Sequence, residues 1–267
     1  MPAVSTIVDL QAAAVEPLAL LDLAVEADAL RAVRDSLDAT GLVLLGEIHG
    51  ILQTAGLLGE LVDLLDIGLV ALEWPAEVTG TVATWVATGE LPDHPYLWLG
   101  DGRITAGHLR LLKQLGGRTP PVNLLLFDAT DPRSIDPATM STEQMWTARD
   151  HAMAEVLLSA LTGSGQRCLA VAGNLHTHLT EGRYGRPMGA WLADDLPGLR
   201  AVTVRYGPGR LYNGGSHTIT SERPDMASAT LHLDQQHLLL DLPAPAEAVV
   251  PHRQVPADRP SSGRSGG

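Results

Sequence analysis

The chain has 267 residues, 45% of them hydrophobic, which is enough to bury the core of one domain of ordinary size. Its formal net charge is -13 and it has no run of lysine and arginine. This argues against a nucleic-acid backbone or an anionic membrane as partner, because both attract a basic surface. A neutral or cationic small molecule is the partner that the charge favours. Cys168 is the single cysteine, which excludes an intramolecular disulfide and a CxxC site.

The first residues of the chain do not predict a leader or a membrane anchor. Asp9, Glu16 and Asp22 interrupt this segment, which lacks the basic start and the small-residue cleavage site of a signal peptide. No stretch of the sequence approaches the roughly 20 apolar residues that cross a bilayer. We therefore expect a cytoplasmic protein.

Short apolar runs predict β-strands, with helices between them. Near-continuous hydrophobicity over such a length is typical of strands covered on both faces. The runs are 42–45, 69–72, 122–127, 168–172 and 201–205. Amphipathic periodicity predicts helices at 51–66 and 142–162. The alternation of strand and helix indicates right-handed crossovers and an α/β fold, with a mostly parallel central sheet flanked by helices.

After Tyr206 the pattern changes. The turn-rich segment GPGRLYNGG is followed by short strand-like runs at 217–220, 229–233 and 237–242. Short strands separated by turn residues suggest an antiparallel extension of the sheet.

The end of the chain predicts no structure. From Pro243 the composition is dominated by proline, alanine, serine, glycine and arginine without periodicity, which predicts a disordered tail over 243–267. We therefore expect a single α/β domain over 1–242, with its core at about 40–206.

Polar residues follow four of the predicted strands. In an open parallel sheet, ligands bind beyond the carboxyl ends of the strands, so these positions are the first candidates for a site. They are Gly46-Glu47-Ile48-His49-Gly50, Glu73-Trp74-Pro75, Asp128 and Gly173-Asn174-Leu175-His176-Thr177-His178. Separate strands thus bring carboxylates and imidazoles to one edge of the sheet, where we expect the functional site.

The segment GEIHG is the strongest of these signals, because its glycines permit a sharp turn and the close approach of a ligand. A carboxylate in a partly apolar crevice has a raised pKa and accepts a proton from water, while a nearby imidazole orients that water or protonates a leaving group. Glu47 and His49 are therefore candidate catalytic residues. The alternative is that Glu47 caps the following helix and His49 is a buried structural histidine.

His176 and His178 suggest metal binding as an alternative to acid–base catalysis. With His49 and a carboxylate such as Glu73 they supply enough ligands for a metal ion, for which His49 and His176 would be the ligands. The spacing matches neither HExxH nor a zinc finger. The alternative for His178 is a surface position beside the loop TEGRYGRP.

Arg149 lies on the apolar stripe of the helix predicted at 142–162. A buried guanidinium is very costly without a partner. Glu47, Glu73 or an anionic group of a substrate would supply one. The alternative is that Arg149 reaches the edge of the helix and pairs with Glu143.

Further residues are candidates for the wall of a substrate pocket. They are Trp74, Trp98, Asp101, Arg103, Asp128, Asn174 and His178. We expect Asp101 and Arg103 to form an ion pair at a helix start, and His108 to be a packing residue on an apolar stripe. The chain has no GxSxG, P-loop or GxGxxG motif, and Cys168 begins an apolar strand. Covalent catalysis by serine or cysteine is therefore not expected.

Six motifs occur in a fixed order over about 40–206. They are GEIHG, ALEWP, DGR, ARDHAMAEVL, AGNLHTHL and GRPMGAWL. Together they resemble the motif set of the superfamily that includes the erythromycin esterases and the ChaN- and Tiki-like proteins. The RDxxMA helix and the MGAWL segment are most similar to the esterase branch, whereas the GN-x-H strand end and the compact length are most similar to the ChaN branch.

The resemblance implies a function that differs by branch. Erythromycin esterases hydrolyse a macrolactone with a water activated by the glutamate and histidine of GE-x-H, Tiki-like members are thought to be metal-dependent peptidases, and ChaN-like members bind haem. Carried over to this chain, the catalytic residues would be Glu47, His49, Glu73, Arg149 and His176.

We accordingly expect a hydrolase that cleaves an ester, lactone or amide of a small or medium-sized molecule and requires no cofactor. The alternatives are a haem- or metal-binding protein and a metal-dependent peptidase, in which a divalent transition metal or haem would be bound. The chain is shorter than a typical erythromycin esterase, so neither the helical lid over a macrolide nor the macrolide itself is implied.

Overall fold

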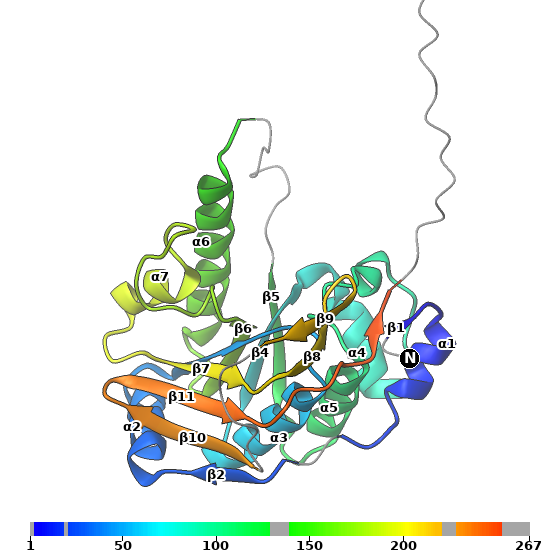
Figure 1. The fold of residues 1–267 in the computed structure, drawn as a ribbon, viewed down its shortest axis with the longest axis horizontal. Helices are drawn as coiled ribbons and strands as arrows, with labels where there is room; N and C mark the ends of the chain where they lie inside the picture. Colours follow the sequence, from blue (N-terminus) through cyan, green and yellow to red (C-terminus); the bar gives the residue numbers. More distant parts are fainter. Residues whose placement is uncertain (1–2, 19–20, 129–138, 221–227, 253–267) are drawn as a thin grey trace, which may run out of the picture.

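The computed structural model describes residues 3–18, 21–128, 139–220 and 228–252. Its central element is an eight-stranded sheet with the order β2-β10-β11-β7-β3-β6-β4-β5 (Figure 1). The strands are β2 (Leu23–Val25), β3 (Leu42–Glu47), β4 (Leu69–Pro75), β5 (Asn123–Asp128), β6 (Cys168–Gly173), β7 (Arg200–Tyr206), β10 (Ala229–Asp234) and β11 (His237–Leu242). All neighbours in this sheet are parallel except β10 and β11. The predicted α/β fold with a mostly parallel sheet is confirmed.

Helices cover both faces of the sheet. One face carries α1 (Ile7–Ala13), α2 (Ala27–Thr40), α3 (Gln53–Leu65), α4 (Thr79–Thr88), α5 (Ala106–Gly116) and the short η1 (Ala76–Val78) and η2 (Pro95–Trp98), and the other carries α6 (Thr142–Leu161) and α7 (Met188–Asp195). Helices α3 and α6 correspond to those predicted at 51–66 and 142–162. Within the described ranges, none of these helices has the length and apolar character that crossing a membrane requires.

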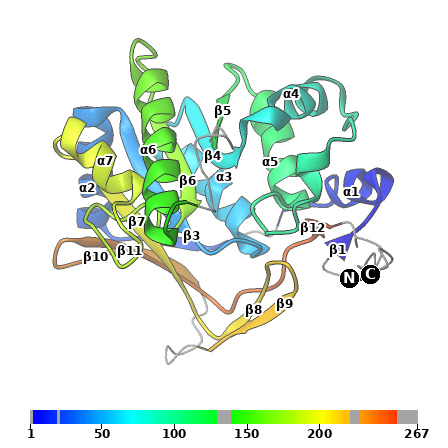
Figure 2. The same cartoon turned by 90° about the horizontal axis from the view of Figure 1, so that it is seen from above.

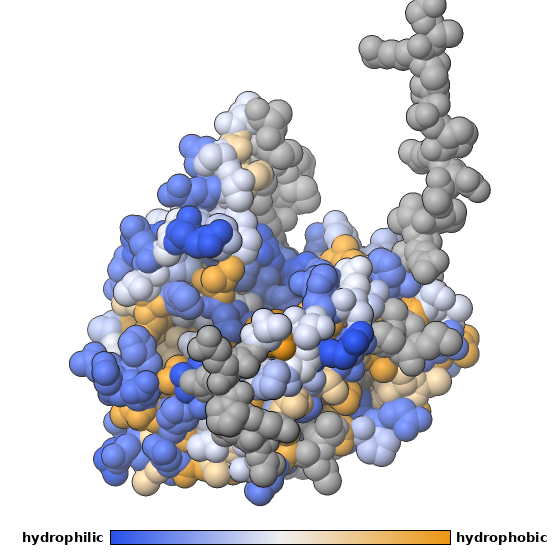
Figure 3. Space-filling view, in the orientation of Figure 1, coloured by the Kyte–Doolittle hydropathy of each residue, from blue (hydrophilic) through white to orange (hydrophobic). Residues whose placement is uncertain are grey.

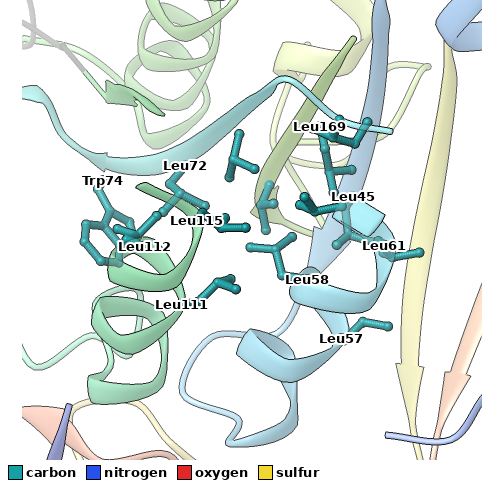
Figure 4. Close-up of a cluster of buried hydrophobic side chains, with 14 of the residues drawn as sticks. Leu45, Leu57, Leu58, Leu61, Leu72, Trp74, Leu111, Leu112, Leu115 and Leu169 are labelled. Carbon is teal, nitrogen blue, oxygen red and sulfur yellow. The ribbon is translucent and has the colours of Figure 1, made fainter. Parts of the chain in front are cut away.

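The larger core lies between the sheet and the helices α3 and α5. Figure 4 shows Leu58 of α3 and Leu111 of α5 pointing toward Leu45 and Leu72 of the sheet. These four side chains are at most 2% exposed. Full burial of a leucine contributes about 1.5–3 kcal/mol. The strand ends that carry the polar residues therefore rest on a closely packed base.

The direction of the crossovers determines where a ligand site can form. After β3 the chain enters α3 on one face, whereas after β6 it reaches α7 on the other face. Strands β3 and β6 are hydrogen-bonded neighbours. Where the connections from adjacent parallel strands diverge to opposite faces, α/β proteins bind ligands at the carboxyl ends of the strands. This point lies between Glu47 and Gly173.

The chain after β7 extends the sheet, as predicted. Strands β10 and β11 are antiparallel to each other, and β11 joins the main sheet by pairing in parallel with β7. Strands β8 (Gly209–Tyr212) and β9 (Ser216–Ile219) form a separate antiparallel pair, which Figure 2 shows beside the main sheet.

Residues 243–252 are ordered, which corrects the predicted start of the tail. Strand β12 (Val250–Pro251) pairs in parallel with β1 (Ala3–Val4). Ala248 and Val250 are at most 2% exposed and pack with Tyr212. Small apolar residues without periodicity are thus buried by partners that are distant in the sequence. The remainder of the predicted tail, 253–267, lies outside the described residues.

The surface around α6 and α7 is largely hydrophilic. In Figure 3, hydrophilic residues predominate over these helices, and hydrophobic residues appear in small groups. This agrees with the strongly acidic composition of the chain.

Candidate active site

Two histidine–carboxylate pairs lie at the carboxyl ends of β3 and β6. Nδ1 of His49 is 2.9 Å from Glu47 Oε1, and Nδ1 of His176 is 2.6 Å from Asp150 Oδ1. Glu47 is the last residue of β3, and Gly50 has a φ of 76°, a conformation that glycine adopts without strain. The glycine allows the turn that brings the chain from β3 into α3. A carboxylate on Nδ1 fixes the orientation of each imidazole.

The partners of His176 determine where its proton is. Nη1 of Arg149 lies 3.2 Å from Nε2 of His176, and an arginine can only donate. Nε2 therefore accepts, and Nδ1 carries the proton that Asp150 accepts. Burial raises the pKa of Asp150, and the hydrogen bond from His176 opposes this rise. The Nδ1–H tautomer of His176 therefore satisfies both partners.

His49 is the more accessible member of the other pair. Its side chain is 18% exposed, against 5% for Glu47. Burial opposes a charge on His49, but the hydrogen bond to Glu47 and the charge of Glu73 outweigh it and raise the pKa of His49 above its ordinary value of 6.5. His49 is therefore a stronger base than a histidine in water.

Glu73, at the end of β4, connects the two pairs. Its Oε2 accepts from the backbone N–H of Gly173 at 2.8 Å and lies 3.7 Å from His49 Nε2. Its Oε1 accepts from Arg149 Nη2 at 2.5 Å and lies 3.7 Å from His176 Nε2. Burial alone would raise the pKa of Glu73, but His176, His49 and two arginines lower it well below its ordinary value of 4.5. Glu73 is therefore a buried, ionised carboxylate.

Two arginines neutralise the carboxylates on the β5 side of the site. Asp128, the last residue of β5, accepts from Arg149 Nη2 at 2.9 Å and from Arg103 Nη1 at 2.6 Å. Burial would raise the pKa of Asp128, but the hydrogen bonds from Arg149 and Arg103 lower it. Arg103 also donates to Asp101 at 2.8 Å, which confirms the predicted ion pair. Arg149 points into the site rather than to the edge of its helix.

A small space above Gly173 is bounded by three of these side chains. A methyl group added to Gly173 would lie 3.2 Å from His49 Nε2 and 3.5 Å from His176 Cδ2. The same methyl group would lie 3.7 Å from Glu73 Oε2. The three side chains therefore converge beside the face of Gly173 that lacks a side chain.

A cavity of about 10 Å³ lies next to this space, which is about the room that one water needs. It is lined by Glu47, His49, Leu72, Glu73, Trp74, Arg103, His108 and Val171. Oε2 of Glu47 is buried there and has no hydrogen-bond partner among the described residues. His108 is 3% exposed, its Nδ1 bonds Thr105, and burial lowers its pKa. A buried, neutral His108 agrees with the packing role expected for it.

The predicted pocket residues fall into two groups. Those at the site are Trp74, Asp101, Arg103 and Asp128. Asn174 instead donates Nδ2 to Val204 O at 3.1 Å, and Trp98 donates Nε1 to Asp93 at 2.6 Å. His178 is exposed and lines a separate groove beside β7 and β11. The chain turns directly after β6, so His178 does not share a side with His176 as an extended backbone would require.

The sequence did not predict Asp150 and Trp146 as site residues. Asp150 bonds His176, and the Trp146 indole stacks on the His176 ring with centroids 4.9 Å apart. Trp146 lies three positions before Arg149 and four before Asp150 on α6, and both spacings place residues on one face of a helix. The inward position of Arg149 was therefore the signal that would have indicated them.

A metal ion does not fit this arrangement of residues. Within the described ranges, no three His, Cys, Asp or Glu side chains are arranged to hold a metal. Both ring nitrogens of His176 have partners, and the positive charges of Arg149 and Arg103 already compensate the carboxylates Glu73 and Asp128. A divalent cation would be repelled by these guanidinium groups.

Comparison with known proteins identifies the fold. No protein-family model matches the chain, and no curated protein matches its sequence. A solved structure of a Bacillus cereus protein is 12% identical, with a TM-score of 0.60, over 83% of this chain and 92% of that chain. A mutant of the erythromycin esterase EreC in its open conformation is 12% identical, with a TM-score of 0.58, over 84% of this chain and 95% of that chain. The chain has the fold of an erythromycin esterase.

A third match supports the same fold. A succinoglycan biosynthesis protein is 10% identical, with a TM-score of 0.58, over 91% of this chain and 97% of that chain. The resemblance that the motifs indicate is confirmed at the level of the fold. Because one fold carries many activities, the reaction has to be argued from the site itself.

Proposed function

We propose that the protein is a hydrolase that cleaves an ester, lactone or amide of a small or medium-sized molecule with a water activated by His49. The main support is the position of His49 Nε2. It faces the space beside Gly173 that His176 and Glu73 also border, while Glu47 holds Nδ1 from behind. A water bound to Nε2 would meet a base and, nearby, an ionised carboxylate.

His49 is a better general base than Glu47, which differs from the role expected for Glu47 from the GEIHG motif. Glu47 is only 5% exposed, and its Oε1 is engaged by His49 Nδ1. Nε2 of the neutral His49 is then the group that can accept a proton from water. Glu47 fixes the tautomer of His49 and stabilises the imidazolium that forms.

The proposed reaction needs only residues of this chain. The water oxygen attacks the carbonyl carbon as its proton moves to His49 Nε2. The tetrahedral intermediate then collapses, the bond to the leaving oxygen or nitrogen breaks, and His49 returns the proton to that atom. The net change is the addition of one water across the ester or amide bond.

Arg149 is the candidate for stabilising the oxyanion. An arginine has five N–H groups. Four of them have partners: the Nε–H and one Nη2–H donate to Asp128, the other Nη2–H donates to Glu73, and one Nη1–H donates to His176. Among the described residues, the second N–H of Nη1 has no partner and is available to a substrate oxygen, where a fixed donor stabilises the developing charge. Arg149 thus positions the carboxylates and also reaches the reacting centre.

The proposal is tested with a panel of an aryl ester, an aliphatic lactone and an anilide. Wild type is compared with His49→Gln and with the matched control His237→Gln, since His237 is exposed at the start of β11. Wild type and the control are expected to turn over at least one substrate at equal rates, and His49→Gln about 100-fold more slowly, with unchanged circular dichroism. Equal rates in the two variants, or no turnover of any substrate by wild type, would contradict the proposal.

A further inference from the structure

Three residues of α6 surround the imidazole of His176. Trp146 stacks on the ring with an interplanar angle of 11°. Arg149 and Asp150 bond its two nitrogens at 3.2 and 2.6 Å. Residues three and four positions apart lie on one face of a helix, so α6 presents all three together. One helix therefore fixes a face of the ring and both of its nitrogens.

The loop that precedes α7 supports Trp146. The ring of Tyr184 stacks on the indole, with centroids 5.2 Å apart and an interplanar angle of 21°. The guanidinium of Arg183 lies 4.5 Å from the centroid of the Tyr184 ring. Trp146 and Tyr184 are both half-buried. The stack therefore runs from the buried His176 out to the charged surface, and it holds the indole in place.

We propose that Trp146 is a positioning residue that keeps His176 in its Nδ1–H tautomer and in contact with Asp150 and Arg149. The two hydrogen bonds restrain the ring within its plane, and the indole prevents it from tilting. Without the indole, space would open beside the ring, and water would compete for the Asp150 carboxylate and for Nε2. Trp146 thus maintains the position of the proton on a site residue.

The effect that loss of Trp146 would have on turnover rests on the proposed function. Nε2 of His176 accepts from the same Nη1 of Arg149 that has an N–H available to the substrate oxygen. A tilted or reprotonated ring would release Nη1 and misplace this donor. The orientation of His176 itself, however, does not depend on what the enzyme hydrolyses, so it is measured separately.

The test combines ring nitrogen NMR with kinetics on the full-length protein. The ¹⁵N signals of the His176 ring are assigned by comparison with His176→Gln. Recorded at a pH above the ordinary pKa of histidine, they report which ring nitrogen carries the proton. The variants are Trp146→Ala and the conservative Trp146→Phe. The matched control is Trp191→Ala, because Trp191 is the indole of α7 that contacts His151 edge-on at 4.5 Å.

Wild type, Trp146→Phe and Trp191→Ala are expected to show a single Nδ1–H tautomer. Trp146→Ala is expected to show averaged tautomers and a kcat about tenfold lower, with KM unchanged within about twofold. Trp146→Phe is expected to restore most of the kcat. Retention of the single tautomer in Trp146→Ala would overturn the proposal, and so would equal tautomer averaging in Trp191→Ala. Absence of turnover by wild type would overturn the proposed function alone, and the NMR result would still decide the role of Trp146.

Discussion

Arg149 of α6 and Glu73 of β4 are joined by a charge-assisted hydrogen bond of 2.5 Å, although 76 positions separate them in the sequence. This bond connects a helix on one face of the sheet to the strand end that carries the central carboxylate. The same guanidinium also bonds Asp128 and His176. Arg149 therefore contributes both to stability and to the geometry of the site.

Replacement of Arg149 by methionine should lower the free energy of unfolding by about 3–5 kcal/mol, because it leaves Glu73 buried without its closest cationic partner. Arg118→Met is the matched control, since Arg118 pairs with the exposed Asp63 on the surface. It should cost less than about 1 kcal/mol. Urea unfolding of both variants gives these values. A similar, small loss in the two variants would show that Arg149 is not an essential partner of the buried carboxylate.

Gly173→Ala should remove most of the activity and little of the stability. The added methyl group would lie 3.2 Å from His49 Nε2 and would crowd the approach of the attacking water to that nitrogen. The backbone at Gly173 does not have a positive φ, so alanine is not strained there. The control is Gly80→Ala on α4, where an added methyl group meets no atom within 4 Å. Steady-state kinetics should show a loss of about 100-fold for Gly173→Ala alone, and a fully active variant would mean that the reaction occurs elsewhere.

Glu47→Gln should move the acidic limb of the pH–rate profile. A general base acts only when it is neutral, so kcat/KM rises with pH through the pKa of His49, which is raised above 6.5 partly by Glu47. Loss of the Glu47 charge lowers that pKa, and the limb should therefore shift to lower pH while the maximal rate falls. Glu60→Gln, at an exposed position of α3, should leave the profile unchanged. An unshifted limb in Glu47→Gln would argue against His49 as the base.

Asp150→Asn should reduce kcat by about 100-fold without unfolding the protein. An asparagine amide can donate to Nδ1 of His176, which favours the opposite tautomer and places an N–H on Nε2 against the Arg149 guanidinium. Asp194→Asn on α7 is the control, because Asp194 is exposed and pairs with Arg186. Kinetics and thermal melting are measured together for both variants. An active Asp150→Asn variant would show that the tautomer of His176 is irrelevant to turnover.

The strands that build the site were predictable because each is a near-continuous apolar run. All six residues of β3, for example, are buried. Their carboxyl ends were predictable as the site because the geometry of parallel sheets places them at one edge. A buried partner for Arg149 followed from the cost of burying a guanidinium, and Glu73 was one of the candidates, along with Glu47 and a substrate anion. By contrast, β2 and β12 are two to three residues long and pair with distant segments, so they leave no periodic signal.

The orientation of individual side chains was less predictable than their position in the chain. Whether Trp98 and His178 face the site depends on the turns beside them, and the sequence does not specify those dihedral angles. Asp150 and Trp146 were missed because the rotation of α6 about its own axis is determined by packing against the sheet. The proposed allocation of the base to His49 rather than Glu47 rests on relative burial, which only the three-dimensional structure provides.

Direct attack by a water that His49 activates is tested most directly by a single turnover in H₂¹⁸O, with enzyme in excess over a cleavable ester. If water attacks the carbonyl, the acid released in that first turnover carries one ¹⁸O. If a carboxylate such as Glu47 or Glu73 attacks instead, and water then opens the resulting anhydride at the enzyme's carboxyl carbon, the first acid contains only ¹⁶O and the label enters the enzyme. The first result is the one predicted here, and the second would contradict a water-based mechanism.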